Sequence, residues 1–294
     1  MREINARTEV YALLGHPVGH SVSPMLQNSL AEYSGDDLCY TAFDIKNGDI
    51  GTVLRGAHAM GIKGFNVTVP FKQAVMEHIS FVDETAKRIG AVNTLKWTEE
   101  GYEGYNTDMP GFLRSLESEG VELKGRDTVV LGAGGAAYAI CCALLEGGAG
   151  SVTIYNRTMA RAEALMSHFK AFYPGRDIRC AADKEGLITM MGEAGGHFLA
   201  VQTTSLGMYP DTEGKLIEDG PFYALVDEGT DIVFNPSDTA FMKAVRAGKE
   251  GNRAFNGLKM LLYQGMRSYE IWRGHCPEGK DEELLEKMRA AIGG

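Results

Sequence analysis

A lysine and an aspartate, each at the end of a short polar cluster, are well suited to transfer protons. Lys72 closes a segment that carries Asn66 and Thr68, and Asp108 directly follows Thr107. An ammonium group and a carboxylate beside hydroxyl and amide groups can exchange protons with a small polyol while they hold it. The two residues therefore predict a site that handles protons, in which Asp108 holds the ammonium group of Lys72 in place.

Two further polar clusters fit the same ligand. Ser21 and Ser23 alternate with Val22, and in an extended segment their hydroxyl groups would lie on one side, spaced for the two oxygens of a carboxylate. Asn93 and Thr94 follow an apolar run, and polar groups at strand ends line the ligand edge of an open α/β sheet. Four such clusters in about a hundred residues favour a polyol site.

Each cluster also has an ordinary structural interpretation. Lys72 could be a surface lysine, which is the usual fate of this residue type. Ser23 could cap a helix whose first turn contains Pro24, and Asp108 could cap a helix that starts at Met109. A capping aspartate beside Lys72 could still orient the ammonium group, so the two roles of Asp108 are compatible.

A glycine-rich turn predicts a nucleotide cofactor. It follows a β-branched segment, precedes an apolar helical segment and consists of Gly132, Ala133, Gly134, Gly135 and Ala136. The first glycine permits the tight turn, and the second lets the backbone approach a pyrophosphate at the helix N-terminus. Ala137 replaces the third glycine of the usual pattern and still permits close packing of helix on strand. The alternative is a glycine turn that binds no ligand.

The residues that distinguish NAD from NADP are expected about twenty residues after the glycine turn, where an acidic residue would bind the 2′-hydroxyl of NAD. This chain instead carries Asn156, Arg157, Thr158 and Arg161. A guanidinium group can hold a 2′-phosphate with two hydrogen bonds, so the pattern favours NADP over NAD. The alternative interpretation is a solvated helix start. With the Lys–Asp pair, this loop indicates a dehydrogenase.

The pattern of strands and helices indicates an α/β protein of two domains. In the first part we expect strands at 10–14, 40–45, 62–67, 91–97 and 102–105 and helices at 25–33 and 51–60, giving an open, mostly parallel sheet. In the second we expect a Rossmann-type, doubly wound domain with strands at 128–131, 151–155, 178–181, 197–202 and 232–234 and helices at 136–146 and 159–172. Apolar spacing from Leu258 to Trp272 and the segment 281–292 predict C-terminal helices. We place the substrate domain at 1–107 plus 257–294 and the NADP domain at 108–256.

Composition narrows the class of protein. The 294 residues include 29 Lys and Arg against 39 Asp and Glu, a formal charge of −10, which argues against binding to a nucleic acid backbone. The five cysteines are scattered without the spacing of a zinc site, so we expect free thiols and no bound metal. The N-terminus lacks the apolar core of a signal peptide, and no apolar run is long enough to span a bilayer. We therefore expect a cytoplasmic protein that binds no membrane, as a monomer or homodimer.

The chain resembles the shikimate dehydrogenase family over nearly its whole length. The segments that carry the resemblance are 15–24, 66–72, 90–94, 106–108, 132–137, 156–158 and 256–265. Several are long and all occur in the order found in the family. The resemblance implies reversible reduction of 3-dehydroshikimate to shikimate with NADPH, a step towards chorismate and the aromatic amino acids.

The resemblance also implies roles for single residues. Lys72 and Asp108 would be the catalytic pair, and Ser21 and Ser23 would hold the substrate carboxylate. The ring hydroxyls would be bound by Thr68, Asn93, Asp108 and Gln264, beside Asn66 of the same cluster. The loop near the nicotinamide would contain Thr204, Ser205, Leu206, Gly207 and Met208, and Gly257 would lie at the start of the helix on the substrate side.

Two positions depart from the family, and two alternatives remain open. Gln27 stands where the family usually has histidine, and Phe234 stands where a tyrosine is common, which puts substrate affinity in doubt. A quinate/shikimate dehydrogenase that uses NAD is one alternative; Ser21, Ser23 and Arg157 count against it. A metabolite sensor without catalytic activity is the other, and the presence of both Lys72 and Asp108 argues against it.

Overall fold

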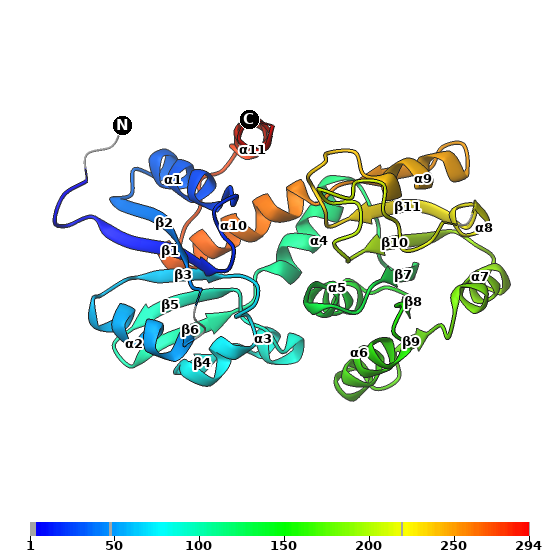
Figure 1. Cartoon of the computed structure of the whole chain (residues 1–294), viewed down its shortest axis with the longest axis horizontal. Coiled ribbons are helices and arrows are strands. Elements are labelled where there is room, and N and C mark those ends of the chain that lie inside the picture. The colour runs from blue at the N-terminus through cyan, green and yellow to red at the C-terminus, as the bar shows by residue number, and fades with distance from the viewer. Residues whose placement is uncertain (1–3, 47–48, 219, 294) are drawn as a thin grey trace. The chain divides into compact units, whose positions relative to one another are not determined.

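The computed structural model describes residues 4–46, 49–218 and 220–293, and the chain divides into two compact units. Unit 1 contains Met1–Gly111 and Leu262–Gly294, and unit 2 contains Phe112–Leu261. The divisions fall inside two helices, α4 (Asp108–Ser118) and α10 (Leu258–Arg273), a few residues beyond the expected boundaries. Each unit has its own sheet (Figure 1).

The sheet of unit 1 is mixed. Its strand order is β2-β1-β3-β5-β6-β4, where β1 is Glu9–Gly15, β2 Leu38–Asp44, β3 Gly64–Val67, β4 Phe81–Val82, β5 Thr94–Thr98 and β6 Gly101–Tyr105. Strand β1 pairs in parallel with β2 and β3, whereas β5 is antiparallel to both β3 and β6. The parallel half places the carboxyl ends of β1, β2 and β3 at one edge, next to the predicted substrate residues.

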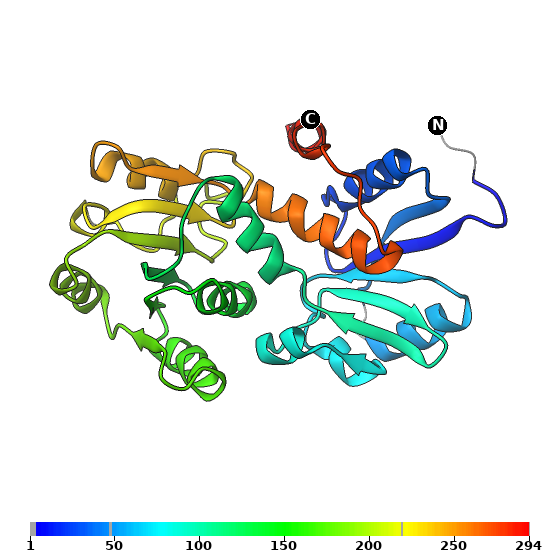
Figure 2. The ribbon, with the colours of Figure 1, turned by 180° about the vertical axis from the view of Figure 1, so that it is seen from behind.

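Helices and a buried core support this sheet. The helices are α1 (Ser23–Ser34), α2 (Ile50–Ala59), a 3₁₀ helix η1 (Ala74–His78), α3 (Glu84–Ile89) and α11 (Asp281–Ile292). The C-terminal part of α10 crosses the sheet, as Figure 2 shows, and the indole Nε1 of Trp272 donates to the carbonyl of Leu95 at 2.8 Å. Gly64 makes room for this ring, because a Cβ there would lie 2.6 Å from the indole nitrogen. The C-terminal segment of the chain is therefore part of the fold of unit 1.

The sheet of unit 2 is parallel throughout. Its order is β12-β11-β10-β7-β8-β9, where β7 is Asp127–Leu131, β8 Ser151–Tyr155, β9 Asp177–Cys180, β10 Phe198–Gln202, β11 Val226–Asp231 and β12 Arg253–Phe255. Its helices are α5 (Gly135–Glu146), α6 (Met159–Phe172), α7 (Lys184–Glu193), α8 (Gly220–Tyr223) and α9 (Ala240–Gly248). The strand order reverses between β7 and β10, which is the point where such folds bind nucleotides. The expected Rossmann-type α/β architecture is confirmed.

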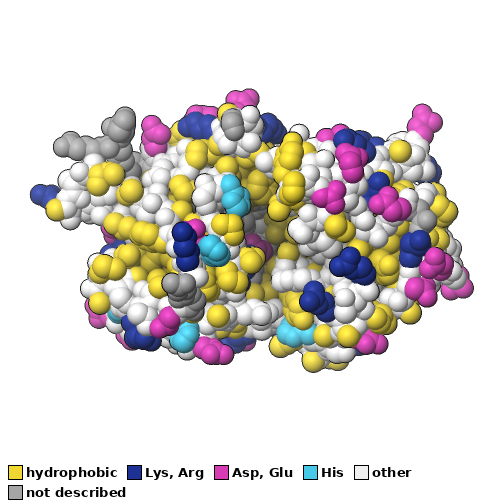
Figure 3. All heavy atoms as spheres, in the orientation of Figure 1, with side chains coloured by type: hydrophobic (Ala, Val, Ile, Leu, Met, Phe, Trp, Pro, Cys, Tyr) yellow, Lys and Arg dark blue, Asp and Glu magenta, His cyan; other side chains and the backbone are white. Residues whose placement is uncertain are grey.

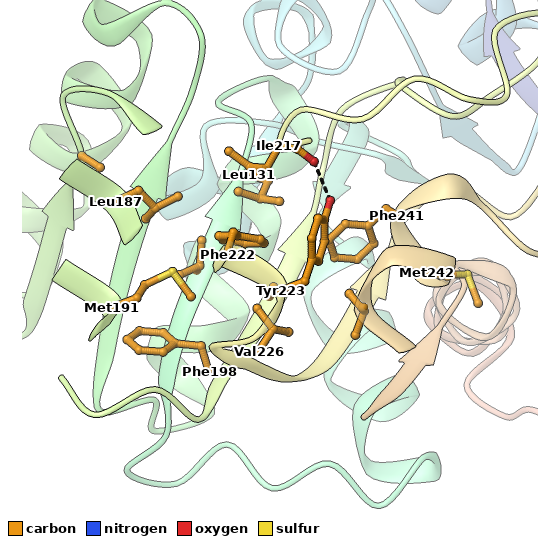
Figure 4. Close-up of a cluster of buried hydrophobic side chains, with 14 residues drawn as sticks. Leu131, Leu187, Met191, Phe198, Ile217, Phe222, Tyr223, Val226, Phe241 and Met242 are labelled. Atoms are coloured by element: carbon orange, nitrogen blue, oxygen red, sulfur yellow. Dashed lines mark hydrogen bonds between the residues drawn. The ribbon is translucent and has the colours of Figure 1, made fainter. Parts of the chain in front are cut away.

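An aromatic cluster forms much of the core of unit 2. Phe222, Tyr223 and Phe241 pack with Val226 and Met191 in a group of buried side chains (Figure 4). The hydroxyl of Tyr223 donates to the carbonyl of Ile217 at 2.7 Å, so the one polar group of these rings is satisfied. This cluster ties α7, α8 and α9 to the sheet that carries the glycine turn.

Several expected elements are wrong in extent. No strand covers 232–234; β11 ends at Asp231, whose side chain accepts a hydrogen bond from the backbone N–H of Val233 and turns the chain. The strand expected from residue 91 begins only at Thr94. Sequence analysis gave no indication of helices α3, α7 and α9. Helix α3 has only 6 residues, and α7 contains Gly186 and Gly192, which weaken the helical pattern.

The surface carries charges of both signs. Figure 3 shows lysine, arginine, aspartate and glutamate side chains interspersed over one face. Within the described ranges, no helix combines the length and the apolar character needed to cross a bilayer.

Candidate active site

Lys72 and Asp108 form a short ion pair. The Nζ of Lys72 lies 2.6 Å from Oδ2 of Asp108, and the two side chains are 29% and 14% exposed. Lys72 lies in the turn between β3 and η1, and Asp108 is the first residue of α4. The turn is anchored because the carbonyl of Lys72 accepts from the N–H of Val92 at 2.8 Å and the preceding Phe71 is buried. The pair is held firmly while the ammonium group stays accessible.

Asn93 orients the carboxylate of this pair. Its Nδ2 donates to Oδ1 of Asp108 at 2.9 Å and to the hydroxyl of Thr107 at 3.0 Å, while its Oδ1 accepts from the N–H of Thr107 at 2.8 Å. Asn93 is 2% exposed, so these bonds are shielded from water. Both oxygens of Asp108 are therefore in hydrogen bonds, one to Asn93 and one to Lys72.

The cap of α4 comes from a different residue than expected. The side chain of Asn106 accepts from the N–H of Asp108 at 3.0 Å and of Met109 at 3.4 Å. The expectation that Asp108 caps this helix is therefore wrong. Because Asn106 takes that role, the carboxylate of Asp108 remains available to Lys72.

A buried hydroxyl network lies behind Asn93. The hydroxyl of Ser268 in α10 is 2.8 Å from that of Thr94 and 3.1 Å from that of Thr107. It also accepts from Nδ2 of Asn66 at 2.8 Å. Ser268 is fully buried, and sequence reasoning missed it. The only signal was its position one helical turn after Gln264.

Asn66 lies in this network and is itself buried. Its Oδ1 accepts from the hydroxyl of Tyr40 at 2.8 Å, and its Nδ2 also approaches the carbonyl of Asn93 at 3.3 Å. Burial raises the pKa of Tyr40 well above its ordinary value, so the phenol remains a neutral donor. The carboxamide of Asn66 is thus occupied by protein groups.

Ser21 and Ser23 lie together, but for a reason other than the one expected. The hydroxyl of Ser21 donates to the hydroxyl of Ser23 at 3.1 Å, and the backbone N–H of Ser23 donates to the hydroxyl of Ser21 at 3.2 Å. Val22 has φ −85° and ψ −2°, so the segment turns rather than extends. Ser23 is the first residue of α1 and makes no capping bond, so that alternative is also wrong.

Gln264 lies at one end of the same network, and Thr68 directly follows the strand that carries Asn66. Thr68 follows β3, is partly buried, and donates its N–H to the carbonyl of Leu14. Oε1 of Gln264 lies 3.5 Å from the hydroxyl of Thr107. Helix α4 approaches α10 closely here, because a Cβ on Gly111 would lie 2.7 Å from the backbone nitrogen of Gln264. Nε2 of Gln27 donates to the carbonyl of Gly265, the residue after Gln264, and so ties α1 to α10.

The glycine turn of unit 2 has the form that a pyrophosphate requires. Gly132 has φ +112°, and a Cβ there would lie 2.6 Å from the hydroxyl of Thr203. Gly134 is the N-cap of α5; it and Gly135 are exposed, and a Cβ on either would meet no atom within 4 Å. Ala137 is fully buried against the sheet. The open N-terminus of α5 thus fits an anionic ligand.

The segment that we expect to determine cofactor specificity follows β8. Nδ2 of Asn156 donates to the carbonyl of Thr158 at 2.9 Å and closes a turn before α6 begins at Met159. Arg157 and Arg161 are exposed. Their guanidinium groups therefore stand in solvent, available to a phosphate.

The loop after β10 is held by a residue that sequence reasoning missed. Gln202, the last residue of β10 and 1% exposed, bonds to the backbone of Thr204 and Leu206. Ser205 and Met208 are exposed, while Gly207 is buried with φ +83°.

Gly257 lies where a Cβ would clash with the carbonyl of Ile232, so its role in the fold is close backbone packing. Phe234 is partly buried just after β11.

A doubly wound sheet with a glycine turn at its switch point, in a chain that also holds an accessible Lys–Asp pair, defines a class: oxidoreductases that depend on a dinucleotide. Two family models match, the shikimate dehydrogenase substrate binding domain at residues 13–95 and shikimate / quinate 5-dehydrogenase at 115–181. A shikimate dehydrogenase (NADP(+)) of Moorella thermoacetica is 41% identical, covering 100% of this chain and 98% of that protein. The chain belongs to the shikimate dehydrogenase family.

Solved structures agree. A shikimate dehydrogenase in complex with NADP+ superposes with a TM-score of 0.87 at 32% identity, covering 99% of this chain and 98% of the other. The Thermus thermophilus shikimate 5-dehydrogenase, in complex with NADP(H) and shikimate, gives 0.83 at 33% identity, covering 97% and 100%.

Proposed function

We propose that this chain reduces 3-dehydroshikimate to shikimate, reversibly and with NADPH, and that Lys72 and Asp108 are its catalytic pair. The activity follows from membership of the family and from relatives named shikimate dehydrogenase (NADP(+)). The observation that supports the catalytic roles is the 2.6 Å contact between Nζ of Lys72 and Oδ2 of Asp108. By this function the chain serves the synthesis of chorismate and the aromatic amino acids.

Lys72 is the proton donor in reduction. Bound NADPH supplies the hydride for the ketone carbon, and the ammonium group of Lys72 donates a proton to the ketone oxygen. Asp108 orients that group, and the bond from Asn93 keeps the carboxylate from rotating. In the oxidative direction the same pair receives the hydroxyl proton.

The substrate is bound by short polar side chains of unit 1. Ser21 and Ser23 hold the carboxylate, and their 3.1 Å separation suits its two oxygens. Thr68, Asn93 and Gln264 bind the ring hydroxyls together with Asp108. Asn66 belongs to this group through Asn93 and Ser268, and its buried carboxamide supports the others. We assign residues 1–107 and 257–294 to the substrate domain.

The cofactor is bound by residues 108–256, which we assign to the NADP domain, and by Gly257, the residue that directly follows them. The turn from Gly132 to Ala136 and the N-terminus of α5 hold the pyrophosphate, since the exposed glycines leave room for it. Asn156, Arg157, Thr158 and Arg161 hold the 2′-phosphate that distinguishes NADP from NAD. The loop of Thr204, Ser205, Gly207 and Met208, together with Gly257, serves the nicotinamide half.

An activity assay with different pairs of substrate and cofactor tests this function. Purified protein is given shikimate or quinate with NADP or NAD, and reduced cofactor is followed by absorbance. We expect kcat/KM with NADP and shikimate to exceed that with NAD by about 10- to 100-fold, as for a charge-assisted hydrogen bond to phosphate. Preference for NAD and quinate would favour the quinate/shikimate alternative. No turnover with any pair, with shikimate still bound, would favour the sensor.

A further inference from the structure

Gln202 uses every hydrogen-bonding group of its side chain on one short loop. Its Oε1 accepts from the N–H and from the hydroxyl of Thr204, each at 2.7 Å. Its Nε2 donates to the carbonyls of Leu206 at 3.1 Å and Thr204 at 3.3 Å. The N–H of Leu206 in turn donates to the hydroxyl of Thr204 at 3.2 Å. Since Gln202 is 1% exposed, no water competes for these bonds.

The neighbouring strand repeats the arrangement. Asp231, the last residue of β11, is the register partner of Gln202 and is fully buried. Its Oδ2 accepts from the hydroxyl of Thr239 at 2.7 Å, and its Oδ1 accepts from the N–H of Val233 at 3.0 Å. The two loops meet where a Cβ on Gly207 would lie 3.7 Å from the Cβ of Thr239. Each buried side chain therefore fixes the start of a loop, and the two loops lie close together at Gly207 and Thr239.

The loop that Gln202 holds starts beside the glycine turn. Strands β7 and β10 are neighbours, and the hydroxyl of Thr203 donates to the carbonyl of Leu131 at 2.9 Å. The same hydroxyl is the group nearest to a Cβ placed on Gly132. Ser205 and Met208, in contrast, are exposed. The loop is thus rigid on its inner side and offers free side chains at the nucleotide edge of the sheet.

We infer that Gln202 is a positioning residue for the nicotinamide half of the dinucleotide: its carboxamide sets the course of residues 203–208 before the cofactor binds. This inference rests on the proposed function, which assigns that loop to the nicotinamide half. Gln202 itself touches only protein groups, so it acts through Thr204 and Leu206.

Two substitutions separate the halves of the carboxamide. Gln202→Glu keeps both acceptor bonds but replaces the donor with an oxygen that faces two carbonyl groups. Gln202→Met keeps the length and removes all four bonds. Asn252→Asp is the matched control, because Asn252 also donates a carboxamide N–H to a backbone carbonyl, that of Val245 at 3.0 Å. Asn252 precedes β12 and so lies at the amino ends of these parallel strands, away from the nucleotide edge.

The first readouts need no catalysis. We expect the amides of Thr204 and Leu206 in Gln202→Met, and the amide of Leu206 in Gln202→Glu, to exchange hydrogen at least about 10-fold faster than in the wild type. We expect both Gln202 variants to bind NADP at least about 10-fold more weakly than the wild type, as measured by calorimetry, because their loop must become ordered when the cofactor binds. Adenosine 2′,5′-bisphosphate lacks the nicotinamide, so its affinity should change by less than about 2-fold. Asn252→Asp should leave all three quantities unchanged.

Kinetics complete the test. We expect kcat/KM for NADP to fall by about 10- to 100-fold in the Gln202 variants. Faster amide exchange with unchanged NADP affinity would overturn the inference, and so would an equal loss of affinity for NADP and for the bisphosphate. If the wild type binds NADP but does not oxidise shikimate, the proposed function fails, while the binding and exchange data still decide the role of Gln202.

Discussion

At the scale of single residues, the orientation of Asp108 is the feature on which the proposed chemistry depends. Its two oxygens bond to Asn93 and Lys72, and its backbone N–H bonds to Asn106. A carboxylate fixed in this way holds the lysine with little freedom to rotate. The ammonium group that we propose as the proton donor is therefore oriented before the substrate arrives.

Asp231 gives the protein a dependence of stability on pH. Its burial raises the pKa from 3.8 to about 7, against smaller opposing effects of the bonds from Thr239 and Val233. The folded state then holds a proton that the unfolded chain releases above pH 3.8. The stabilisation is complete below that pH and is lost as pH rises through about 7.

Asp231→Asn should remove this dependence, since the amide can accept from Val233 and donate to Thr239 without becoming charged. Between about pH 5 and pH 8, we expect the wild type to lose on the order of 2–3 kcal/mol of unfolding free energy relative to the variant. Urea unfolding at a series of pH values measures the difference. Parallel curves for the two proteins would show that Asp231 is ionised throughout.

Sequence reasoning proposed a catalytic pair that the structure places in contact, but it missed the buried residues around that pair and in the loop after β10. Lys72 and Asp108 stood out because charged groups closed polar clusters. Ser268 and Gln202 did not, because a lone serine in a helix or a glutamine at a strand end has no local signature. Their roles arise from contacts such as that of Ser268 with Asn66, which join segments far apart in the sequence.

At the scale of elements, the turn between β7 and α5 uses its glycines for different purposes. Gly132 needs its positive φ and its closeness to Thr203, whereas Gly134 has φ −91° and open space around it. The first glycine serves the fold, and we expect the second to serve the cofactor.

Two alanine substitutions should separate these purposes. Gly132→Ala should lower the unfolding free energy by about 2 kcal/mol or more, because alanine is strained at positive φ and would meet Thr203. Gly134→Ala should change stability by less than about 1 kcal/mol but weaken NADP binding by about 10-fold, since the methyl group would occupy the approach of the pyrophosphate. Thermal unfolding and calorimetry give the two values. Normal NADP affinity in Gly134→Ala would place the pyrophosphate elsewhere.

Elements with a clear local sequence pattern were predicted well, and elements without one were not. The helix at 281–292 and the strands of the glycine-turn region agree with α11, β7 and β8. Helix α9, in contrast, begins with a cap from Thr239. The apolar side of this helix packs against the sheet next to β11, a contact that only the tertiary structure defines. Local sequence could not reveal that contact, because β11 itself contains the polar residues Asp227, Glu228 and Thr230.

At the scale of the whole molecule, the chain builds one unit from two distant segments and the other from a continuous one. Helix α10 completes unit 1 through Trp272, Ser268 and Gln264, which lie more than 150 residues after the segments that they contact. The two-domain α/β class was predictable from the order of strand and helix patterns. The network that α10 forms with β3 and β5 was not, since no local pattern shows which sheet a C-terminal helix joins.

The measurement that bears most directly on the catalytic pair is a comparison of two lysines. Lys72 and Lys87 each lie 2.6 Å from a carboxylate, but the pair of Lys87 with Glu84 is more exposed and lies on α3. We expect Lys72→Met to lower kcat for shikimate oxidation by about 10²- to 10⁴-fold with KM within about 5-fold, because the lost group acts on the proton in the transition state. Lys87→Met should retain wild-type kcat. A Lys72→Met enzyme with near-normal kcat would contradict the assignment of Lys72 as the proton donor.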